Sequence, residues 1–305
     1  MLGASYGWAN AWGEMTLVFF TTVAPSAAVA YMLMAAVLAF SKLDEEVYRH
    51  LRKLLWVPLT LCMVGLVASS THLGNPANAL YVITRIGESP LSNEVCGAVV
   101  FLACSAVFWL AGFAVERKKV LDAVLVAAVE VTGAVCVALI SLAYNVDTIV
   151  TWSLPLFPAT IALSGGIGGT LVAHECLRAA VPRYGAAGAS GGARSGMRVL
   201  ARALLAAFVV CGVAWIGMHA IVGRQLAGLG NALFSAAELV PMYGLCLAIA
   251  AALLVVAGLV EVWAARLHPR QARIAGIGGI ALALCAIFIM RVMFYMMHLT
   301  AGVAL

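Results

Sequence analysis

The chain has 305 residues, of which 64% are hydrophobic and only 10% are charged. This composition excludes a soluble globular protein, because so few polar residues could not cover a surface in contact with water. The formal net charge of +5 comes from the loops between apolar stretches. Attraction to anionic lipid headgroups accounts for this charge, so we expect a lipid membrane as a partner and no nucleic acid.

Eight long apolar stretches follow one another along the chain. A helix needs roughly 20 such residues to cross a hydrocarbon core about 30 Å thick. The apolar residues run continuously rather than alternating, which favours helices over a barrel. The sequence therefore predicts an all-α integral membrane protein, with residues 1–305 as a single transmembrane domain. The predicted helices span about 16–40, 54–71, 94–115, 120–143, 154–178, 199–223, 241–265 and 274–299.

Basic residues fall almost entirely on every second loop. The first, third, fifth and seventh loops hold 15 of the 18 Lys and Arg residues. Positively charged loops stay in the cytoplasm, so both termini and the second, fourth and sixth loops should lie outside. The 15 residues are Lys42, Arg49, Arg52, Lys53, Arg117, Lys118, Lys119, Arg178, Arg183, Arg194, Arg198, Arg202, Arg266, Arg270 and Arg273.

Two stretches rich in small residues organise the predicted bundle. Residues 181–196 are rich in Gly, Ala and Ser, which is typical of a flexible linker. This linker divides the helices into two groups of four, and a parallel repeat would fit that layout. The fifth span contains GGIGG at 165–169. We interpret it as a packing seam rather than a cofactor-binding loop, because no strand precedes it.

The second loop is the densest polar segment. It begins with His72 at the end of a span and contains Arg85 and Glu88 before Glu94 opens the next span. A histidine near the membrane surface can exchange a proton close to neutral pH. The alternative is an interfacial histidine that binds only a carbonyl group or a lipid headgroup.

The other outer segments carry further candidates. The fourth loop contains Asp147, a possible proton acceptor or docking group, and Trp152, which we interpret as an interfacial anchor. Near the end of the last span, Arg291, Tyr295 and His298 are spaced to share one helix face. That face should point into the bundle, because an arginine directed at lipid is costly.

Several alternatives remain open from the residues. His72, His219 and His298 could ligate a haem b in a quinol-oxidising cytochrome subunit. Arg291 and Glu130 within spans, with the repeat, would suit a secondary transporter. The eight cysteines include no C-x-x-C pair, so we predict neither an iron–sulfur cluster nor a metal site. Near the cytoplasmic side, His174, Glu175 and Glu261 could pair.

Four stretches resemble the membrane anchor subunit of dimethyl sulfoxide reductase and related molybdopterin oxidoreductases. They are THLGNPANALYVITRIGESPLSNEV (71–95), YNVDTIVTW (144–152), ELVPMYG (238–244) and RVMFYMMHLTAGVAL (291–305). The eight-span layout with both ends outside is also similar. The resemblance implies an anchor that oxidises menaquinol at the outer face of a bacterial plasma membrane during anaerobic respiration. Electrons would pass to a docked iron–sulfur subunit and then to a molybdopterin catalytic subunit.

The resemblance also implies roles for individual residues. His72 resembles the family's quinol-site histidine, and Glu94 is the acid of its Ser-Asn-Glu segment, so these two are the expected catalytic pair. The family generally lacks haem, and we expect no activity from this subunit in isolation. We expect the menaquinol ring to bind in an apolar slot at the ends of spans two, three and eight. The expected quinol-binding residues are His72, Arg85, Glu94, Asp147, Arg291, Tyr295 and His298, and the expected docking residues are Asn75, Glu88, Asn145, Asp147 and Glu238.

Overall fold

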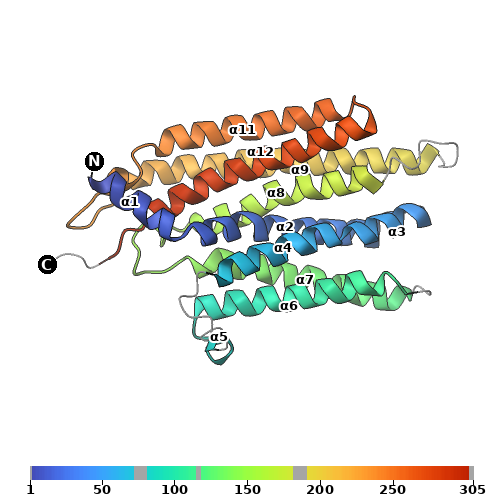
Figure 1. The fold of residues 1–305 in the computed structure, drawn as a ribbon, viewed down its shortest axis with the longest axis horizontal. Coiled ribbons are helices and arrows are strands. Elements are labelled where there is room, and N and C mark those ends of the chain that lie inside the picture. The colour runs from blue at the N-terminus through green and yellow to red at the C-terminus, as the bar shows by residue number, and fades with distance from the viewer. Residues whose placement is uncertain (1, 72–80, 115–117, 181–190, 302–305) are drawn as a thin grey trace.

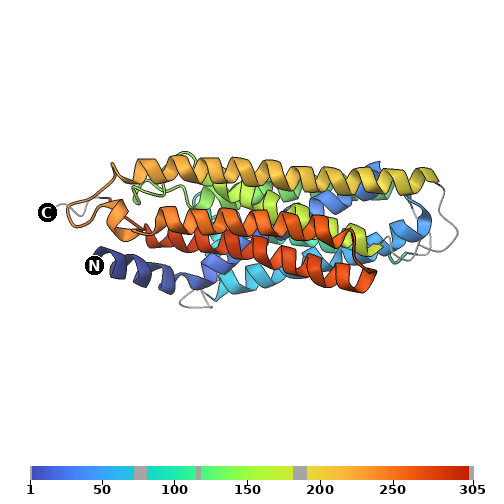
Figure 2. The same ribbon diagram turned by 90° about the horizontal axis from the view of Figure 1, so that it is seen from above.

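The computed structural model describes residues 2–71, 81–114, 118–180 and 191–301. These residues form a bundle of long helices lying roughly along one axis, and its extended segments form only isolated bridges (Figures 1 and 2). The helices are α1 (Leu2–Gly13), α2 (Met15–Phe40), α3 (Glu45–Leu54), α4 (Trp56–Ser70), α5 (Tyr81–Thr84), α6 (Pro90–Ala111), α7 (Lys119–Ala143), α8 (Phe157–Ala180), α9 (Gly191–Leu226), α10 (Ala236–Leu239), α11 (Tyr243–Ala264) and α12 (Pro269–Met296).

Seven helical segments in the described part of the protein are long and apolar enough to cross a membrane. They are Met15–Phe40, Glu45–Ser70, Pro90–Ala111, Lys119–Ala143, Gly196–Leu226, Tyr243–Ala264 and Pro269–Met296. The predicted span 154–178 overlaps α8, which is not among the seven. Polar side chains such as Ser164, His174 and Glu175 interrupt its apolar character, and they are buried inside the protein. A bundle of eight crossing helices therefore stays a prediction.

The helix ends separate into two sets at opposite ends of the bundle. The N-terminus and the last turn of α12 lie at one end, together with the C-terminal ends of α4, α7 and α9 (Figure 1). The helix ends that flank the four basic loops lie at the other end, which we call the basic end. The basic residues, which alternate between loops in the sequence, thus belong to loops at one end of the molecule.

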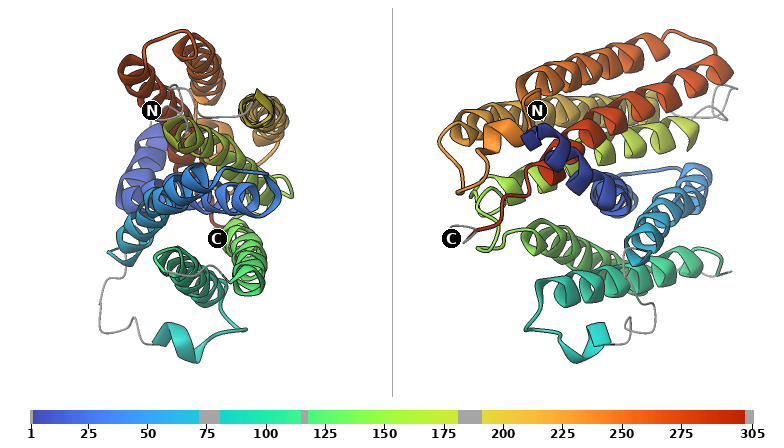
Figure 3. Two further views of the ribbon diagram at one scale, coloured as in Figure 1. Left: turned by 90° about the vertical axis from the view of Figure 1, so that its right-hand side faces the viewer. Right: turned by 60° about the vertical axis from the view of Figure 1, so that its left-hand side comes forward.

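The long helices pack as two groups of four. The helices α2, α4, α6 and α7 contact one another in a ring, and α8, α9, α11 and α12 form a second ring with the same order of contacts. The end-on view in Figure 3 shows these groups on either side of the α2–α8 contact. The secondary contacts between the groups also correspond, because α12 meets α2 and α7 meets α8. This packing is the one that a parallel repeat would give.

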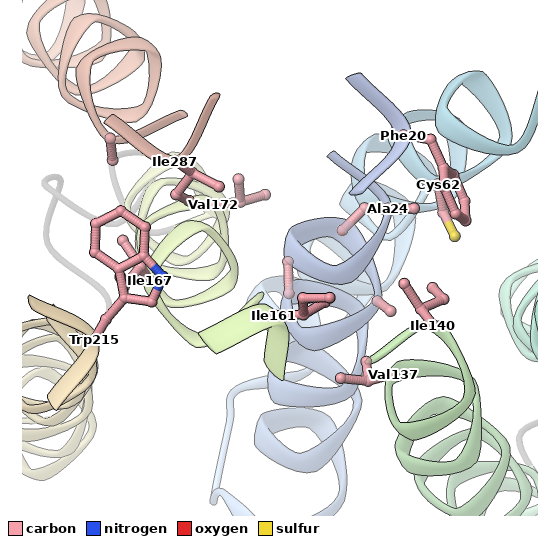
Figure 4. Packing of buried hydrophobic residues seen from close by; sticks show 14 of the residues in the cluster. Phe20, Ala24, Cys62, Val137, Ile140, Ile161, Ile167, Val172, Trp215 and Ile287 are labelled. Atoms are coloured by element: carbon pink, nitrogen blue, oxygen red, sulfur yellow. The ribbon is translucent and has the colours of Figure 1, made fainter. Parts of the chain in front are cut away.

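The contact between α2 and α8 is a seam of glycines. A Cβ atom at Gly169 would lie 2.7 Å from the Val29 Cβ and 2.8 Å from the Ala30 nitrogen of α2. One at Gly165 would lie 3.0 Å from the Pro25 carbonyl oxygen. The small residues at 165–169 therefore let two backbones approach closely, as the sequence predicts. Figure 4 shows Ile161 of α8 between α2 and α7, and Trp215 of α9 beside Ile167.

The protein begins with a helix that the sequence analysis does not predict. In α1, Gly3, Gly7 and Ala11 face the bundle and pack against α10 and α12. The rings of Trp8 and Trp12 on the same helix are exposed. Aromatic side chains are typical of the membrane–water interface, so α1 covers the end of the bundle that carries the N-terminus.

Candidate functional site

The segment after α7 is held against the end of α12. The Val150 N–H donates to the Leu299 carbonyl at 2.9 Å, and the Ala301 N–H donates to the Thr148 carbonyl at 2.8 Å. The Thr151 hydroxyl donates to the Met297 carbonyl. These bonds fix the fourth loop, which the sequence places far from α12, beside three of the predicted site residues.

A buried aromatic cluster forms at this junction. The Trp152 ring stacks on Phe294 with centroids 4.8 Å apart, and its Nε1–H donates to the Phe294 carbonyl at 3.0 Å. Tyr144 packs edge-on against Trp152 and Tyr295, at 6.0 Å and 5.8 Å. The prediction that Trp152 is an interfacial anchor is therefore wrong. The ring is buried because the fourth loop folds inward over α12.

Arg291 and Tyr295 point into the bundle from α12, as their spacing predicts. Only 1% of the surface of each of these two residues is exposed. The Arg291 guanidinium donates to the Thr160 carbonyl at 3.1 Å and to the Ser164 hydroxyl at 3.2 Å. Among the described residues, the Arg291 Nε and the Tyr295 hydroxyl have no hydrogen-bond partner of good geometry. Buried polar groups without partners cost free energy and are often found at functional sites.

His298 is not on the helix that carries Arg291, so the predicted common face is wrong at this position. The helix ends at Met296, because the backbone turns there to pair with the fourth loop. The half-buried His298 ring lies 5.1 Å from the Trp152 ring. Burial lowers the pKa of His298, although the nearby Glu14 carboxylate partly opposes this. The imidazole is therefore predominantly neutral at neutral pH and can accept a proton.

Glu94 is buried near the start of α6. This helix begins at Pro90, and the Ser89 side chain caps it by accepting a hydrogen bond from the Ser92 N–H at 3.5 Å. Only 2% of the Glu94 surface is exposed. Burial raises the pKa of Tyr144 well above its ordinary value, and the charges of Tyr295 and Glu94 raise it further. The structure thus places the ring of Tyr144, a residue to which the sequence analysis gives no role, against Tyr295, and the charges of Glu94 and Arg291 act on it.

The remaining predicted site residues are not part of this buried cluster. Arg85, Glu88, Asn145, Asp147 and Glu238 are all exposed. Arg85 follows α5, which contacts α6 and lies at the edge of the bundle farthest from α11 (Figures 1 and 3). The structure thus does not bring Arg85 to Arg291. His72 and Asn75 lie outside the described residues.

An apolar groove of about 310 Å³ opens between α6 and α7. Asn93 and Thr132 supply its few polar groups, and Ile86 lies at its edge. The Asn93 side chain accepts a hydrogen bond from Gly87, whose φ of 91° suits glycine. The sequence predicts a slot at the ends of spans two, three and eight, and that slot stays a prediction. The groove that the structure describes lies between spans three and four, with Asn93 on its wall and Glu94 buried next to it in the sequence.

A second buried polar pair lies in the other four-helix group. His219 Nδ1 is 2.8 Å from the Tyr243 hydroxyl, and the Trp215 ring packs at 4.5 Å from the imidazole. His219 Nε2 has no hydrogen-bond partner among the described residues. The sequence analysis does not predict Tyr243 as the partner, because nothing in the sequence indicates that this residue of α11 faces α9.

The fold and the site define a multi-pass helical membrane protein with a buried polar and aromatic cluster at the end opposite its basic loops. Residues 8–297 match the family described as DMSO reductase anchor subunit (DmsC), and the protein belongs to this family. It is therefore the membrane anchor subunit of a dimethyl sulfoxide reductase-type complex, part of an oxidoreductase system in a bacterial membrane.

Relatives match along almost the whole sequence. The protein is 29% identical to the C subunit of anaerobic dimethyl sulfoxide reductase from Escherichia coli over 298 residues, which cover 97% of this protein and 98% of the relative. It is 28% identical to YnfH, another anaerobic dimethyl sulfoxide reductase subunit of E. coli, with 97% and 99% covered. The C subunit of the Haemophilus influenzae anaerobic dimethyl sulfoxide reductase is 27% identical, with 96% and 97% covered.

Proposed function

We propose that this anchor binds menaquinol at the end of the bundle opposite the basic loops and passes its electrons to a docked iron–sulfur subunit. A molybdopterin catalytic subunit would then use them to reduce the terminal acceptor. The observation that carries the proposal is the burial of Glu94 near the start of α6, close enough to Tyr144 and Tyr295 to act on them electrostatically, with Arg291 also buried. A buried carboxylate with such neighbours is a functional candidate inside a membrane protein.

The groove between α6 and α7 supports an entry point for a quinol. Its volume of about 310 Å³ is at the lower limit of ordinary small-molecule pockets, and its walls are almost entirely apolar. Asn93 lines the groove, and Glu94 is the next residue on the inner face of the same helix. A quinol ring in this groove would therefore contact α6 at Asn93, the residue next to the proposed proton acceptor.

Quinol oxidation releases two protons and two electrons, and each must have a destination. Glu94 and His72 would accept the two protons, and His298, neutral at neutral pH, could relay one of them. Arg291 would orient the ring and stabilise the negative charge that develops on a quinol oxygen as it loses its proton. The electrons would leave to the partner's nearest cluster, because we predict neither haem nor an iron–sulfur cluster in this subunit.

Exposed acidic residues support a docking surface at the same end. Glu88, Asp147 and Glu238 are exposed there, and Glu238 also caps α10 through Ser235. A partner on this surface would lie close to the proposed quinol site. If this end faces outward, as the basic loops predict, protons are released on the side where the reductase sits and no charge crosses the membrane.

The haem alternative is less well supported. The Trp215 ring packs against the His219 imidazole, and His298 lies beyond the end of α12 beside Trp152. The transporter alternative predicts broken helices at the midplane, whereas α2 continues through Pro25. A reduced-minus-oxidised spectrum of the purified complex should show no sharp alpha band.

Glu94→Gln tests the quinol site, with Glu46→Gln, an exposed glutamate at the basic end, as the control. We expect Glu94→Gln to lower menaquinol-linked reductase activity by about 10²–10⁴-fold, the usual contribution of a general base. Activity with an artificial donor to the partner subunits should be unchanged, because the complex still assembles. Equal menaquinol-linked activity in the two variants would refute the role of Glu94.

Sidedness is tested separately by cysteine labelling. We expect Asp147→Cys to react with a membrane-impermeant maleimide in intact cells, whereas Gly196→Cys at the basic end should react only after lysis. The reverse pattern would overturn the outward placement of the quinol site.

A further inference from the structure

Three buried ionisable side chains meet near the basic end, far from the proposed quinol site. His174 and Glu175 come from α8, and Glu261 comes from α11. The His174 Nδ1 lies 3.3 Å from the Glu261 Oε2 and 3.5 Å from the Glu175 Oε1. One ligand atom from each residue lies within 4.8 Å of the other two. The Glu261 side chain is completely buried, and the other two are at most 10% exposed.

The atoms that face one another have no hydrogen-bond partner of good geometry. Within the described part of the protein, this holds for both Glu261 oxygens, the His174 Nδ1 and the Glu175 Oε1. A protonated imidazole has only one N–H at Nδ1 and could serve only one of the two carboxylates. A single ion between the three side chains would satisfy all of them.

Two glycines of α12 leave room for the carboxylates. A Cβ atom at Gly279 would lie 2.7 Å from the Glu261 Oε1, and one at Gly276 would overlap the Glu175 carboxylate. These glycines are three residues apart and therefore share a helix face. The carboxylates thus fit between α8, α11 and α12 only because α12 has glycine at these two positions.

The charges of the cluster favour a cation. Arg178 donates to the Glu175 Oε2 and to the Ala272 carbonyl, both at 2.5 Å. Arg178 thus fixes the Glu175 carboxylate and leaves its Oε1 directed at His174. Residues that hydrogen-bond to a metal ligand commonly orient it in this way. With a neutral imidazole, two carboxylates and one guanidinium leave one uncompensated negative charge in a buried site.

We infer that His174, Glu175 and Glu261 bind one divalent transition-metal ion, such as Zn²⁺, that joins α8 to α11. Imidazole nitrogen and carboxylate oxygen are ordinary zinc ligands, with bonds of roughly 2.0–2.1 Å. Tetrahedral ligands at that distance are about 3.4 Å apart. The separations of His174 from Glu261 and Glu175, 3.3 Å and 3.5 Å, agree with this value, and the two carboxylates lie within 4.8 Å of each other. The site is structural and independent of the proposed quinol chemistry.

The test measures metal binding by the purified full-length protein in detergent. We expect the wild-type protein to bind one Zn²⁺ in a calorimetric titration, to melt at a higher temperature with Zn²⁺, and to show the visible bands of tetrahedral Co²⁺ after substitution. Absence of these signals from folded wild-type protein would overturn the proposal and leave a buried ion pair.

Variants locate the site. His174→Ala should weaken Zn²⁺ binding by more than about 100-fold, since changes to outer partners alone cost 10–100-fold. The matched control is His268→Ala, because His268 lies at the same end of the bundle, outside the cluster, and should not affect binding. A second pair leaves all three ligands in place: Gly279→Ala should weaken binding, whereas Gly278→Ala, where a Cβ meets nothing within 4 Å, should not. Unchanged Zn²⁺ binding in folded His174→Ala, or equal loss in His268→Ala, would refute the assignment.

Discussion

The glycine seam between α2 and α8 joins the two four-helix groups, so a single methyl group there should loosen the whole bundle. In Gly169→Ala the new Cβ would lie 2.7 Å from the Val29 Cβ and 2.8 Å from the Ala30 backbone nitrogen. Carbon atoms in favourable contact are roughly 3.5–4.0 Å apart, so the two helices must separate by about 1 Å. The Ala30 nitrogen belongs to the backbone and cannot move aside by rotation.

The expected loss of stability is the difference between two opposing effects. Inserting a methylene into a well-packed interior costs about 1–3 kcal/mol, and contact with a backbone favours the upper end. Replacing glycine by alanine in a helix returns up to about 1 kcal/mol. The net loss is about 2 kcal/mol, which corresponds to a Tm lower by about 4 °C for a protein of this size.

The assay is thermal unfolding of the purified protein in one detergent, with Gly217→Ala as the control. A Cβ at Gly217 meets nothing within 4 Å, so that variant should melt no lower than wild type. If Gly169→Ala and Gly217→Ala have the same Tm, the close approach of α2 and α8 does not hold the two groups together.

Three further predictions concern other contacts. Arg52→Met should lower the free energy of unfolding by about 3–5 kcal/mol, because it breaks a buried ion pair with Asp122. Arg49→Met removes an exposed ion pair and should cost about 0.5 kcal/mol or less, so similar melting temperatures of the two variants would contradict the prediction. The lowered pKa of His298 means that the folded protein binds fewer protons than the unfolded protein below about pH 6.5. Stability should therefore fall as pH falls through that value, and His298→Ala should reduce this dependence; parallel curves of Tm against pH would show that His298 contributes nothing. Gly7→Ala should release α1 from the bundle, because the new Cβ would lie 2.6 Å and 2.9 Å from carbonyl oxygens of α10 and α12. Gly13→Ala should not, because a Cβ there meets nothing within 4 Å. An unchanged emission spectrum of the α1 tryptophans in Gly7→Ala would count against this docking.

The apolar stretches and the basic loops could be interpreted from the sequence because each depends on local composition. Seven of the predicted spans coincide with helices that are long and apolar enough to cross a membrane. The inward direction of Arg291 and Tyr295 followed from the cost of exposing an arginine to lipid. The GGIGG seam was also predictable, because only small residues allow such close backbone contact.

The site required contacts between distant segments. Trp152 is typical of an interfacial anchor by its sequence alone, but its loop folds over α12 and buries it beside Phe294. His298 has helical spacing to Tyr295, yet hydrogen bonds to residues near 150 draw it off the helix. Nothing in the sequence around Tyr144 indicates its role, because that role depends on its packing against Trp152 and Tyr295.

The sequence by itself thus determined that this is a helical membrane protein with one basic end, because hydropathy and charge act residue by residue against the bilayer. Only the tertiary structure decided which polar groups share a buried space. His174 and Glu261 are 87 positions apart in the numbering yet lie 3.3 Å apart, because the packing of α8 against its own four-helix group brings them together.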